Sequence, residues 1–279
     1  MRTIQPYFVI ATSTYHKEVM MKHGISHFYR FCRDTKDIPE VLAVPDGCVD
    51  ILFEKDEQGV RGRAAGTMLK NEHIENIPGR EYFGVRFQPG VCPAILDTSL
   101  ADLTNAELNL EDVLYDKDML KEIEETKEED AWIDIFLKHY EKALQMQEER
   151  RSREDGTNNA IVHFVQDAMI HSNGTASIAK LAQDTGYSER YVHKLFSQEM
   201  GISPKAFGKI MQFQKAIQLI NQENDQTKLT DIGMESGYYD QAHFIREFKK
   251  YAQLTPGKYS HLIQTCHYSS RIIETNVRE

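Results

Sequence analysis

The chain has 279 residues, of which 41% are hydrophobic and 27% charged, a composition that suits two ordinary globular domains. It has no apolar run long enough for a membrane span and no secretory signal pattern, so we expect a cytoplasmic protein. The net charge of −10 argues against a non-specific nucleic-acid binder. The acidity is uneven, however, because residues 158–268 contain eleven Lys or Arg against ten Asp or Glu, whereas residues 1–157 contain 20 against 31.

The four cysteines are widely scattered, at Cys32, Cys48, Cys92 and Cys266. No C-x-x-C pair occurs, so we expect reduced, partly buried thiols, no bound metal and no cofactor. A metal or redox site formed by Cys48, Cys92 and His73 is a weaker alternative, because its spacing is too open for a typical site.

Residues 1–97 contain short β-type runs separated by turn residues such as Pro45-Asp46-Gly47 and Pro89-Gly90. These runs predict a β-rich or mixed N-terminal unit, without specifying its topology. The predicted strands are Ile25–Cys32, Glu40–Val44, Cys48–Glu54 and Glu81–Phe87.

Residues 98–153 have a helical pattern. In Ala131–Arg150, the apolar residues Trp132, Phe136, Tyr140 and Leu144 recur every four positions and form a stripe on one helix face. The stripe packs on its own domain or forms the seam of a homodimer, and the pattern leaves both interpretations open. The charged stretch 148–156 predicts a solvated linker, which we place at 154–157 between residues 1–153 and the rest.

Residues 158–262 read as helices throughout and contain the elements of a helix-turn-helix twice. In the first copy, residues 177–199, Ser177 and Ser188 are predicted N-caps and Gly186 is the turn residue. In the second copy, residues 229–251, Thr230 is the predicted N-cap and Gly237 the turn residue.

A longer helix, Pro204–Glu223, lies between the two copies and would fix the distance between them. The expected fold class is therefore α+β: a β-rich mixed domain with trailing helices, then an all-α domain of two helix-turn-helix motifs. Residues 263–279 are expected to form a C-terminal tail.

The chain resembles the AraC/XylS family of bacterial transcription regulators over roughly residues 158–262. The motif that carries this resemblance is DIGMESGYYDQAHFIREFKK at 231–250, followed by LTPGKY at 254–259. The first copy agrees in IAKLA at 178–182, GYS at 186–188 and GISP at 201–204. The resemblance implies a DNA-binding transcription regulator, expected to be an activator, that is not an enzyme and has RNA polymerase as a partner.

In this family the second helix of each motif enters the major groove of double-stranded DNA, and its outward residues meet the base edges. Carried over by position, the base readers are Arg190, His193, Lys194, Asp240, Gln241, Ala242, Ile245 and Arg246. The expected phosphate contacts are Ser188, Lys205, Lys249 and Lys250.

Two residues depart from the family pattern. Gly233 stands where alanine is usual inside a helix, at a cost of roughly 1 kcal/mol in helix propensity. Gln253 stands where glycine is usual, which is unfavourable if that position is left-handed.

The motifs PDGCVDILF at 45–53 and GVRFQPG at 84–90 resemble an N-terminal module found in a subgroup of these regulators. Arg86 lies in a strand-like run, where a charge needs a partner. It is predicted to pair with Asp46 or Asp50. The pair lines a pocket for a small-molecule effector, or it is a buried salt bridge that only stabilises the fold.

Two other classes of function remain open. An enzyme with a DNA-targeting tail is disfavoured, because the sequence contains no phosphate loop, histidine-rich metal motif or nucleophile elbow. An architectural DNA-binding protein without any effector fits the same residues, and only a ligand-dependent DNA affinity would distinguish it from a regulator.

Overall fold

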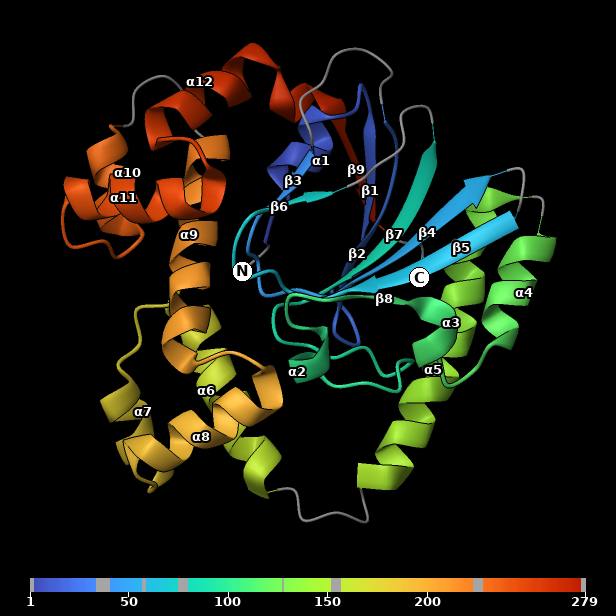
Figure 1. Ribbon diagram of the computed structural model, residues 1–279, viewed down its shortest axis with the longest axis horizontal. Helices are drawn as coiled ribbons and strands as arrows, with labels where there is room; N and C mark the ends of the chain where they lie inside the picture. Colours follow the sequence, from blue (N-terminus) through green and yellow to red (C-terminus); the bar gives the residue numbers. More distant parts are fainter. Residues whose placement is uncertain are drawn as a thin grey trace.

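The structure is a computed structural model that describes residues 3–33, 41–56, 59–74, 80–126, 128–151, 157–222 and 228–276. A mixed sheet with trailing helices forms the N-terminal part, and helices form most of the C-terminal part (Figure 1). The α+β fold class predicted from the sequence is confirmed.

A seven-stranded sheet is the centre of the N-terminal part, in the order β8-β5-β4-β7-β2-β1-β9. Neighbouring strands are antiparallel except β1 and β9, which pair in parallel. The strands are β1 (Tyr15–Val19), β2 (Ile25–Cys32), β4 (Asp50–Asp56), β5 (Gly59–Ala65), β7 (Glu81–Phe87), β8 (Glu107–Asn109) and β9 (Ile272–Asn276). Two short strands, β3 (Val41–Ala43) and β6 (Glu72–Ile74), form a separate pair.

Strands β2 and β7 have the bounds predicted from the sequence, whereas β4 begins two residues after the predicted start. Strand β1 was not predicted, because its sequence YHKEV has three polar residues in a row and lacks apolar alternation. Residue Glu40 of the predicted strand 40–44 lies outside the described residues.

Both faces of the sheet are buried. Successive side chains of a strand point to opposite faces, so Tyr82 and Phe83 of β7 contribute to two different cores. Phe83 belongs to the core under α4 (Asp118–Glu125) and α5 (Trp132–Arg151), the helices on the right of Figure 1.

The apolar stripe of α5 packs in that core. Trp132, Phe136 and Tyr140 are at most 3% exposed, and the Trp132 ring meets Phe83 edge-on at 5.6 Å between centroids. These residues are therefore not available as a dimer seam. Helix α5 also continues to Arg151, so residues 148–151 are helical and not part of a linker. Residues 154–156 of the predicted linker lie outside the described residues.

The opposite face of the sheet shares its core with the C-terminal helices. Tyr29 and Leu52 of the sheet and Phe8 of α1 (Pro6–Ile10) lie in one cluster with Phe213 and Phe248 of the C-terminal part. The Tyr7 hydroxyl donates to the carbonyl oxygen of Ala252 at 2.6 Å. The two parts are thus joined by a continuous hydrophobic core, not only by a linker.

The C-terminal helices are α6 (Thr157–His171), α7 (Ile178–Thr185), α8 (Glu189–Met200), α9 (Pro204–Gln222), α10 (Leu229–Glu235), α11 (Gln241–Ala252) and α12 (Pro256–Thr265). Short helices α2 (Leu100–Leu103) and α3 (Leu110–Val113) and the 3-10 turns Glu129–Ala131 and Tyr268–Arg271 complete the fold. Because α6 begins at Thr157, the sequence-based placement of residue 157 in a linker is wrong. None of the helices in these ranges is both long enough and apolar enough to cross a bilayer.

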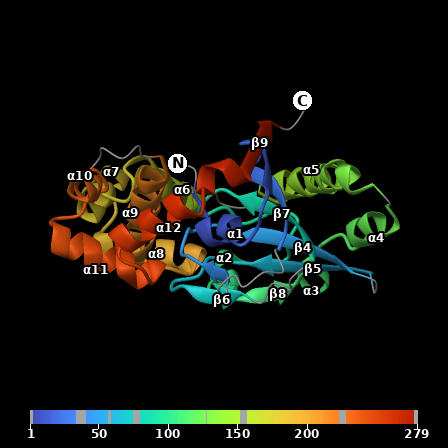
Figure 2. The same cartoon turned by 90° about the horizontal axis from the view of Figure 1, so that it is seen from above.

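The predicted C-terminal tail returns to the N-terminal sheet. Residues 263–265 still belong to α12, and β9 then pairs with β1 at the edge of the sheet (Figure 2). The Arg271 guanidinium fixes this return by donating to the carbonyl oxygens of Ile10 at 2.8 Å and Thr12 at 2.6 Å. Strand β9 therefore belongs to the N-terminal sheet, although it follows the C-terminal helices in the chain.

Candidate nucleic-acid interface

The first helix-turn-helix consists of α7 and α8, and its caps and turn are those predicted. The Ser188 hydroxyl accepts a hydrogen bond from the backbone N–H of Tyr191 at 3.3 Å, and Ser177 similarly accepts from Lys180 at 3.5 Å. Gly186 adopts a φ of +76°, the left-handed conformation that an L side chain resists. These local interactions set the angle at which α8 leaves the turn.

Helix α8 presents two different faces. Val192, Leu195 and Phe196 are buried against α6 and α9 in a hydrophobic cluster. The predicted readers lie on the opposite face, and all of them are exposed: Arg190, His193 and Lys194.

The second helix-turn-helix consists of α10 and α11. Helix α10 begins at Leu229 with Lys228 as its N-cap, so the prediction of Thr230 as the cap is wrong. Thr230 lies one residue inside the helix, where its hydroxyl cannot reach the N–H groups that a cap satisfies. Gly237 has the predicted left-handed turn conformation, with a φ of +80°.

Asp240 is the N-cap of α11, and its Oδ1 atom accepts from the backbone N–H of His243 at 2.7 Å. Phe244, Phe248 and Tyr251 anchor the inner face of the helix and are at most 4% exposed. The outer face carries the other predicted readers, all exposed: Gln241, Ala242, Ile245 and Arg246.

Helix α9 holds α10 and α11 through ion pairs. Lys209 lies 2.7 Å from Glu247 of α11, and Lys215 lies 3.0 Å from Glu235 of α10. The hydrogen bond from Lys209 lowers the pKa of the Glu247 carboxyl. Two lysines of α9 therefore compensate two carboxylates of the second motif, which makes this motif less acidic than its sequence indicates.

The cations of the outer faces have no such partners. Arg190, Lys194, Arg246 and Lys249 form no ion pair with any residue of the described ranges, and each is exposed. Lys205 and Lys250, two of the predicted phosphate contacts, are also exposed. An unpaired guanidinium or ammonium on a convex helix face can pair with a phosphate or with the O6 and N7 atoms of guanine.

Comparison with known proteins agrees with this geometry. A family profile described as "Helix-turn-helix domain" matches residues 181–261, and a second profile, "Domain of unknown function", matches residues 18–109. An uncharacterized HTH-type transcriptional regulator of Haemophilus influenzae is 35% identical over 82 residues. The C-terminal part of the chain is an AraC-type helix-turn-helix domain.

The match to relatives of this AraC-type domain is partial. It covers 29% of this chain and 27% of the Haemophilus protein. The lactose operon transcription activator of Staphylococcus xylosus is 25% identical over 107 residues, which is 38% of each chain. A solved structure described as a probable AraC family transcriptional regulator from Rhodopseudomonas palustris is 27% identical, covers 38% of this chain and 97% of its own, and has a TM-score of 0.34.

The structure explains the two departures from the AraC-type pattern. Gly233 lies under the Phe244 ring, so that an added Cβ would approach two ring carbons to 3.0 and 3.1 Å. Gln253 has a φ of +59°, the left-handed conformation that favours glycine, but its Nε2 donates to Asn71 Oδ1 at 2.9 Å. This hydrogen bond to the N-terminal part offsets some of the backbone strain at Gln253.

Aromatic residues beside the reading helices were not among the predicted site residues. Tyr187 and Tyr191 are both exposed and stack with a centroid distance of 4.9 Å, and Tyr239 is 91% exposed. Tyr187 follows Gly186 directly and Tyr239 lies two positions after Gly237. This position, one or two residues after a turn glycine, is the sequence signal that could have identified Tyr187 and Tyr239.

The predicted partners of Arg86 are both present. Its Nη1 atom lies 3.1 Å from Asp46 Oδ2, and its Nε and Nη2 atoms donate to the two oxygens of Asp50 at 3.0 and 2.6 Å. The Arg86 and Asp46 side chains are 3% and 4% exposed. Burial lowers the pKa of Arg86, but Asp50 and Asp46 outweigh burial and hold it well above its usual value. The effector role of these residues stays a prediction.

Cys48 and Cys92 lie in different surroundings. The Cys48 thiol is 3.0 Å from the Thr3 hydroxyl, whereas the Cys92 thiol donates to the carbonyl oxygen of Thr98 at 3.4 Å. Burial raises the pKa of the Cys92 thiol to about 11. The side chain of His73 lies outside the described part of the structure. Among the residues that are described, no three His, Cys, Asp or Glu side chains converge as metal ligands would.

Proposed function

We propose that this protein is a sequence-specific transcription regulator that places α8 and α11 in two adjacent turns of the DNA major groove. Residues 158–262 would bind DNA, and residues 1–153 would receive the signal that controls binding. The observation that carries this proposal is the pair of capped helices with unpaired, exposed reader side chains, both held by one connector helix.

The length of α9 supports simultaneous binding by the two motifs. Its 19 residues correspond to roughly 28 Å of helix, somewhat less than the roughly 34 Å of one DNA helical turn. The ion pairs of Lys209 and Lys215 hold the second motif on this connector. A fixed separation favours two short sequence blocks about one turn apart.

The proposed contacts divide by chemistry. Arg190, Lys194 and Arg246 suit guanine, Gln241 suits adenine, and the exposed methyl groups of Ile245 suit thymine. His193 and Ala242 complete the base-reading faces, and Asp240 would accept from cytosine with the carboxylate oxygen that does not cap α11. Ser188, Lys205, Lys249 and Lys250 would position the domain through phosphates.

We further propose that the protein activates transcription through contact with RNA polymerase and responds to a small-molecule effector. The named lactose operon activator among its relatives supports activation. A homodimer also remains a proposal, and its interface would have to lie outside Trp132, Phe136 and Tyr140 of the α5 stripe, which are buried.

Selection of binding sites from random duplex DNA tests this function. The full chain is used, because the second motif shares its core with the N-terminal sheet. The expected result is an enriched site with two short blocks about one helical turn apart. Each bidentate arginine contributes about 1–3 kcal/mol, so Arg246→Ala should weaken binding roughly 5- to 150-fold and relax specificity in one block.

Lys194→Ala should weaken binding and relax specificity in the other block, and the variant with both substitutions should do so in both blocks. Lys121→Ala is the matched control, because it removes an exposed cation from α4 in the N-terminal part. If the full chain and its variants enrich no sequence, or if Lys121→Ala weakens binding as much as Arg246→Ala, the proposed interface is wrong.

A further inference from the structure

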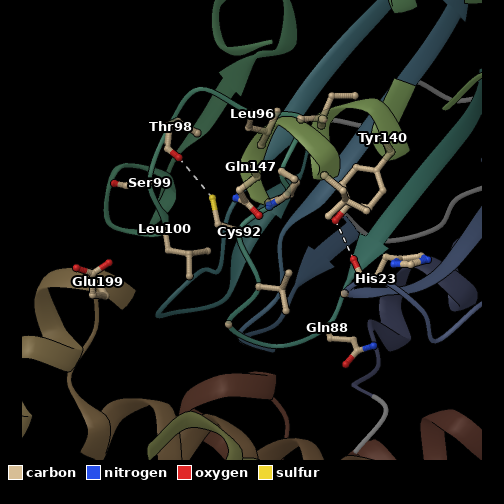
Figure 3. A pocket seen from close by; sticks show the side chains of 18 of the residues that line it. His23, Gln88, Cys92, Leu96, Thr98, Ser99, Leu100, Tyr140, Gln147 and Glu199 are labelled. Atoms are coloured by element: carbon tan, nitrogen blue, oxygen red, sulfur yellow. Dashed lines mark hydrogen bonds between the residues drawn. The ribbon is translucent and has the colours of Figure 1, made fainter. Parts of the chain in front are cut away.

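A cleft of about 880 Å³ separates the N-terminal part from the first helix-turn-helix. One wall consists of the loop 88–100 and the end of α5, and the other of α6 and the last turn of α8. Figure 3 shows Gln147, Cys92 and Leu100 on the first wall and Glu199 on α8 across from them. A molecule bound here would touch both functional parts of the protein.

The apolar lining of the cleft suits an organic body. Tyr115 and Met146 are large apolar side chains that are 44% and 46% exposed, and both line this cleft. Leu100, Val162 and Ile170 extend the apolar surface on both walls. Ligand sites are typically concave and mostly apolar, with a small number of polar groups that orient the ligand.

One of these polar groups is a buried acceptor without a donor. Gln166 is 5% exposed, and its Nε2 atom donates to the carbonyl oxygen of Pro89 at 2.8 Å. Its Oε1 atom is buried and has no hydrogen-bond partner among the described residues. A buried acceptor of this kind is costly unless a donor meets it. Because Gln166 lines the cleft, a turn of its amide toward the cleft would let a ligand supply that donor.

The charged groups of the cleft are also mostly acceptors. Asp167 and Glu199 are exposed carboxylates that form no ion pair within the described ranges. Asp116, the third carboxylate of the lining, is already bound by Lys142 at 3.0 Å. Lys142 is the one lysine or arginine among the described lining residues, so no other lysine or arginine of the lining can pair with Asp167 or Glu199.

Two donors of the lining are already occupied within the protein. The Tyr140 hydroxyl donates to the carbonyl oxygen of His23 at 2.8 Å, and the Cys92 thiol donates to that of Thr98, as the dashed lines in Figure 3 indicate. The cleft therefore offers unsatisfied acceptors and negative charge on an apolar surface. An anionic or purely apolar molecule would leave these groups unpaired.

We infer that this cleft is the effector site and that it takes an organic cation: an amine or guanidinium group on an aromatic or branched apolar body. The cation lies between Asp167 and Glu199, one N–H donates to Gln166 Oε1, and the apolar body covers Tyr115 and Met146. A ligand that touches both walls binds one arrangement of α5 and α6 better than another, and this difference changes DNA affinity. This regulatory consequence rests on the proposed function, whereas binding itself does not.

Calorimetry on the full chain without DNA tests the binding. The probes are 1-naphthylmethylamine, the neutral 1-naphthylmethanol and the anionic 1-naphthoate, which share one ring system and differ in charge. The amine should bind at least tenfold more tightly than the alcohol, and the carboxylate most weakly. Equal binding of the amine and the carboxylate, or no binding of the amine, overturns the inference.

Variants locate the site. Asp167→Asn with Glu199→Gln should abolish the preference for the amine over the alcohol. Gln166→Leu should weaken the binding of both the amine and the alcohol, because each of them donates a hydrogen bond. The matched control is Asp134→Asn with Glu141→Gln, which removes the same charge from exposed positions of α5 outside the cleft. A loss of preference in the control equal to that in the cleft variant also overturns the inference.

The regulatory step is measured separately, as the affinity of the full chain for its selected duplex with and without saturating amine. A change of at least fivefold that disappears in the cleft variant supports the effector role, and an unchanged affinity overturns it. Failure of the proposed function would appear as the absence of any selected duplex, while the calorimetric comparison would still decide whether the cleft binds a cation.

Discussion

Arg86→Met tests how the N-terminal sheet tolerates its buried charges. The substitution removes a guanidinium that is bound by Asp46 at 3.1 Å and by both oxygens of Asp50. Both carboxylates remain in place, with side-chain exposures of 4% and 17%. Breaking a buried pair from one side costs about 3–5 kcal/mol, because the remaining charge has lost its partner.

The assay is urea unfolding followed by near-ultraviolet circular dichroism at pH 7. With a denaturant slope of roughly 2–3 kcal/mol per molar, the expected loss lowers the midpoint by roughly 1–2 M. The loss should shrink as the pH falls. Without Arg86 the folded pKa of Asp46 rises further above its unfolded value, so the penalty is full above that raised pKa and absent below the unfolded pKa near about 3.9.

The triple variant Asp46→Asn, Asp50→Asn, Arg86→Met is the control for this reasoning, since it removes the uncompensated charges and keeps their shape. We expect it to recover at least half of the lost stability. A midpoint shift of Arg86→Met below about 0.3 M, or a triple variant no more stable than the single one, would refute the reasoning. A single variant with an unchanged midpoint and a lost effector response would support the predicted pocket.

Three further predictions follow from individual contacts. Gln214→Leu should lower the free energy of unfolding by about 2–4 kcal/mol in the same assay. The fully buried Gln214 amide accepts from the N–H of Ile4 at 2.8 Å and donates to the carbonyl oxygen of Pro45 at 2.8 Å, and the variant leaves both groups without this partner. An unchanged midpoint would show that these groups find other partners. Gly186→Ala should lower the free energy of unfolding by only about 1–2 kcal/mol, because nothing lies within 4 Å of the added Cβ and the left-handed backbone is the only strain. Gly174→Ala should lower it clearly more, because its Cβ would overlap a carbonyl oxygen of α9. Equal losses of stability in the two variants would contradict this. Asp116→Asn should reduce stability at pH 7 and much less at pH 2. The hydrogen bond from Lys142 lowers the Asp116 pKa to about 2, so most of its stabilising effect is lost as the pH falls from about 4 to 2. A stability difference as large at pH 2 as at pH 7 would contradict the assignment.

Much of the DNA-binding domain could be predicted from the sequence, because its signals are local. Ser188, Gly186 and Gly237 each act within a window of about four residues, where capping and left-handed turns are determined by residue type. The helical period separates Val192 from Lys194 in the same way, as an inner and an outer residue. Thr230 shows the limit of such signals, because a plausible cap lies two residues from the actual one.

What only the tertiary structure decided depends on contacts between distant segments. Local periodicity does not determine that β9 pairs with β1 or that Tyr29 shares a core with Phe248. It also does not determine whether α5 packs on its own sheet or on a dimer partner. A stripe of apolar residues has the same pattern whichever surface buries it. The cleft between α5 and α6 likewise exists only once the two parts are docked, and so do the unpaired acceptors that make it a candidate ligand site.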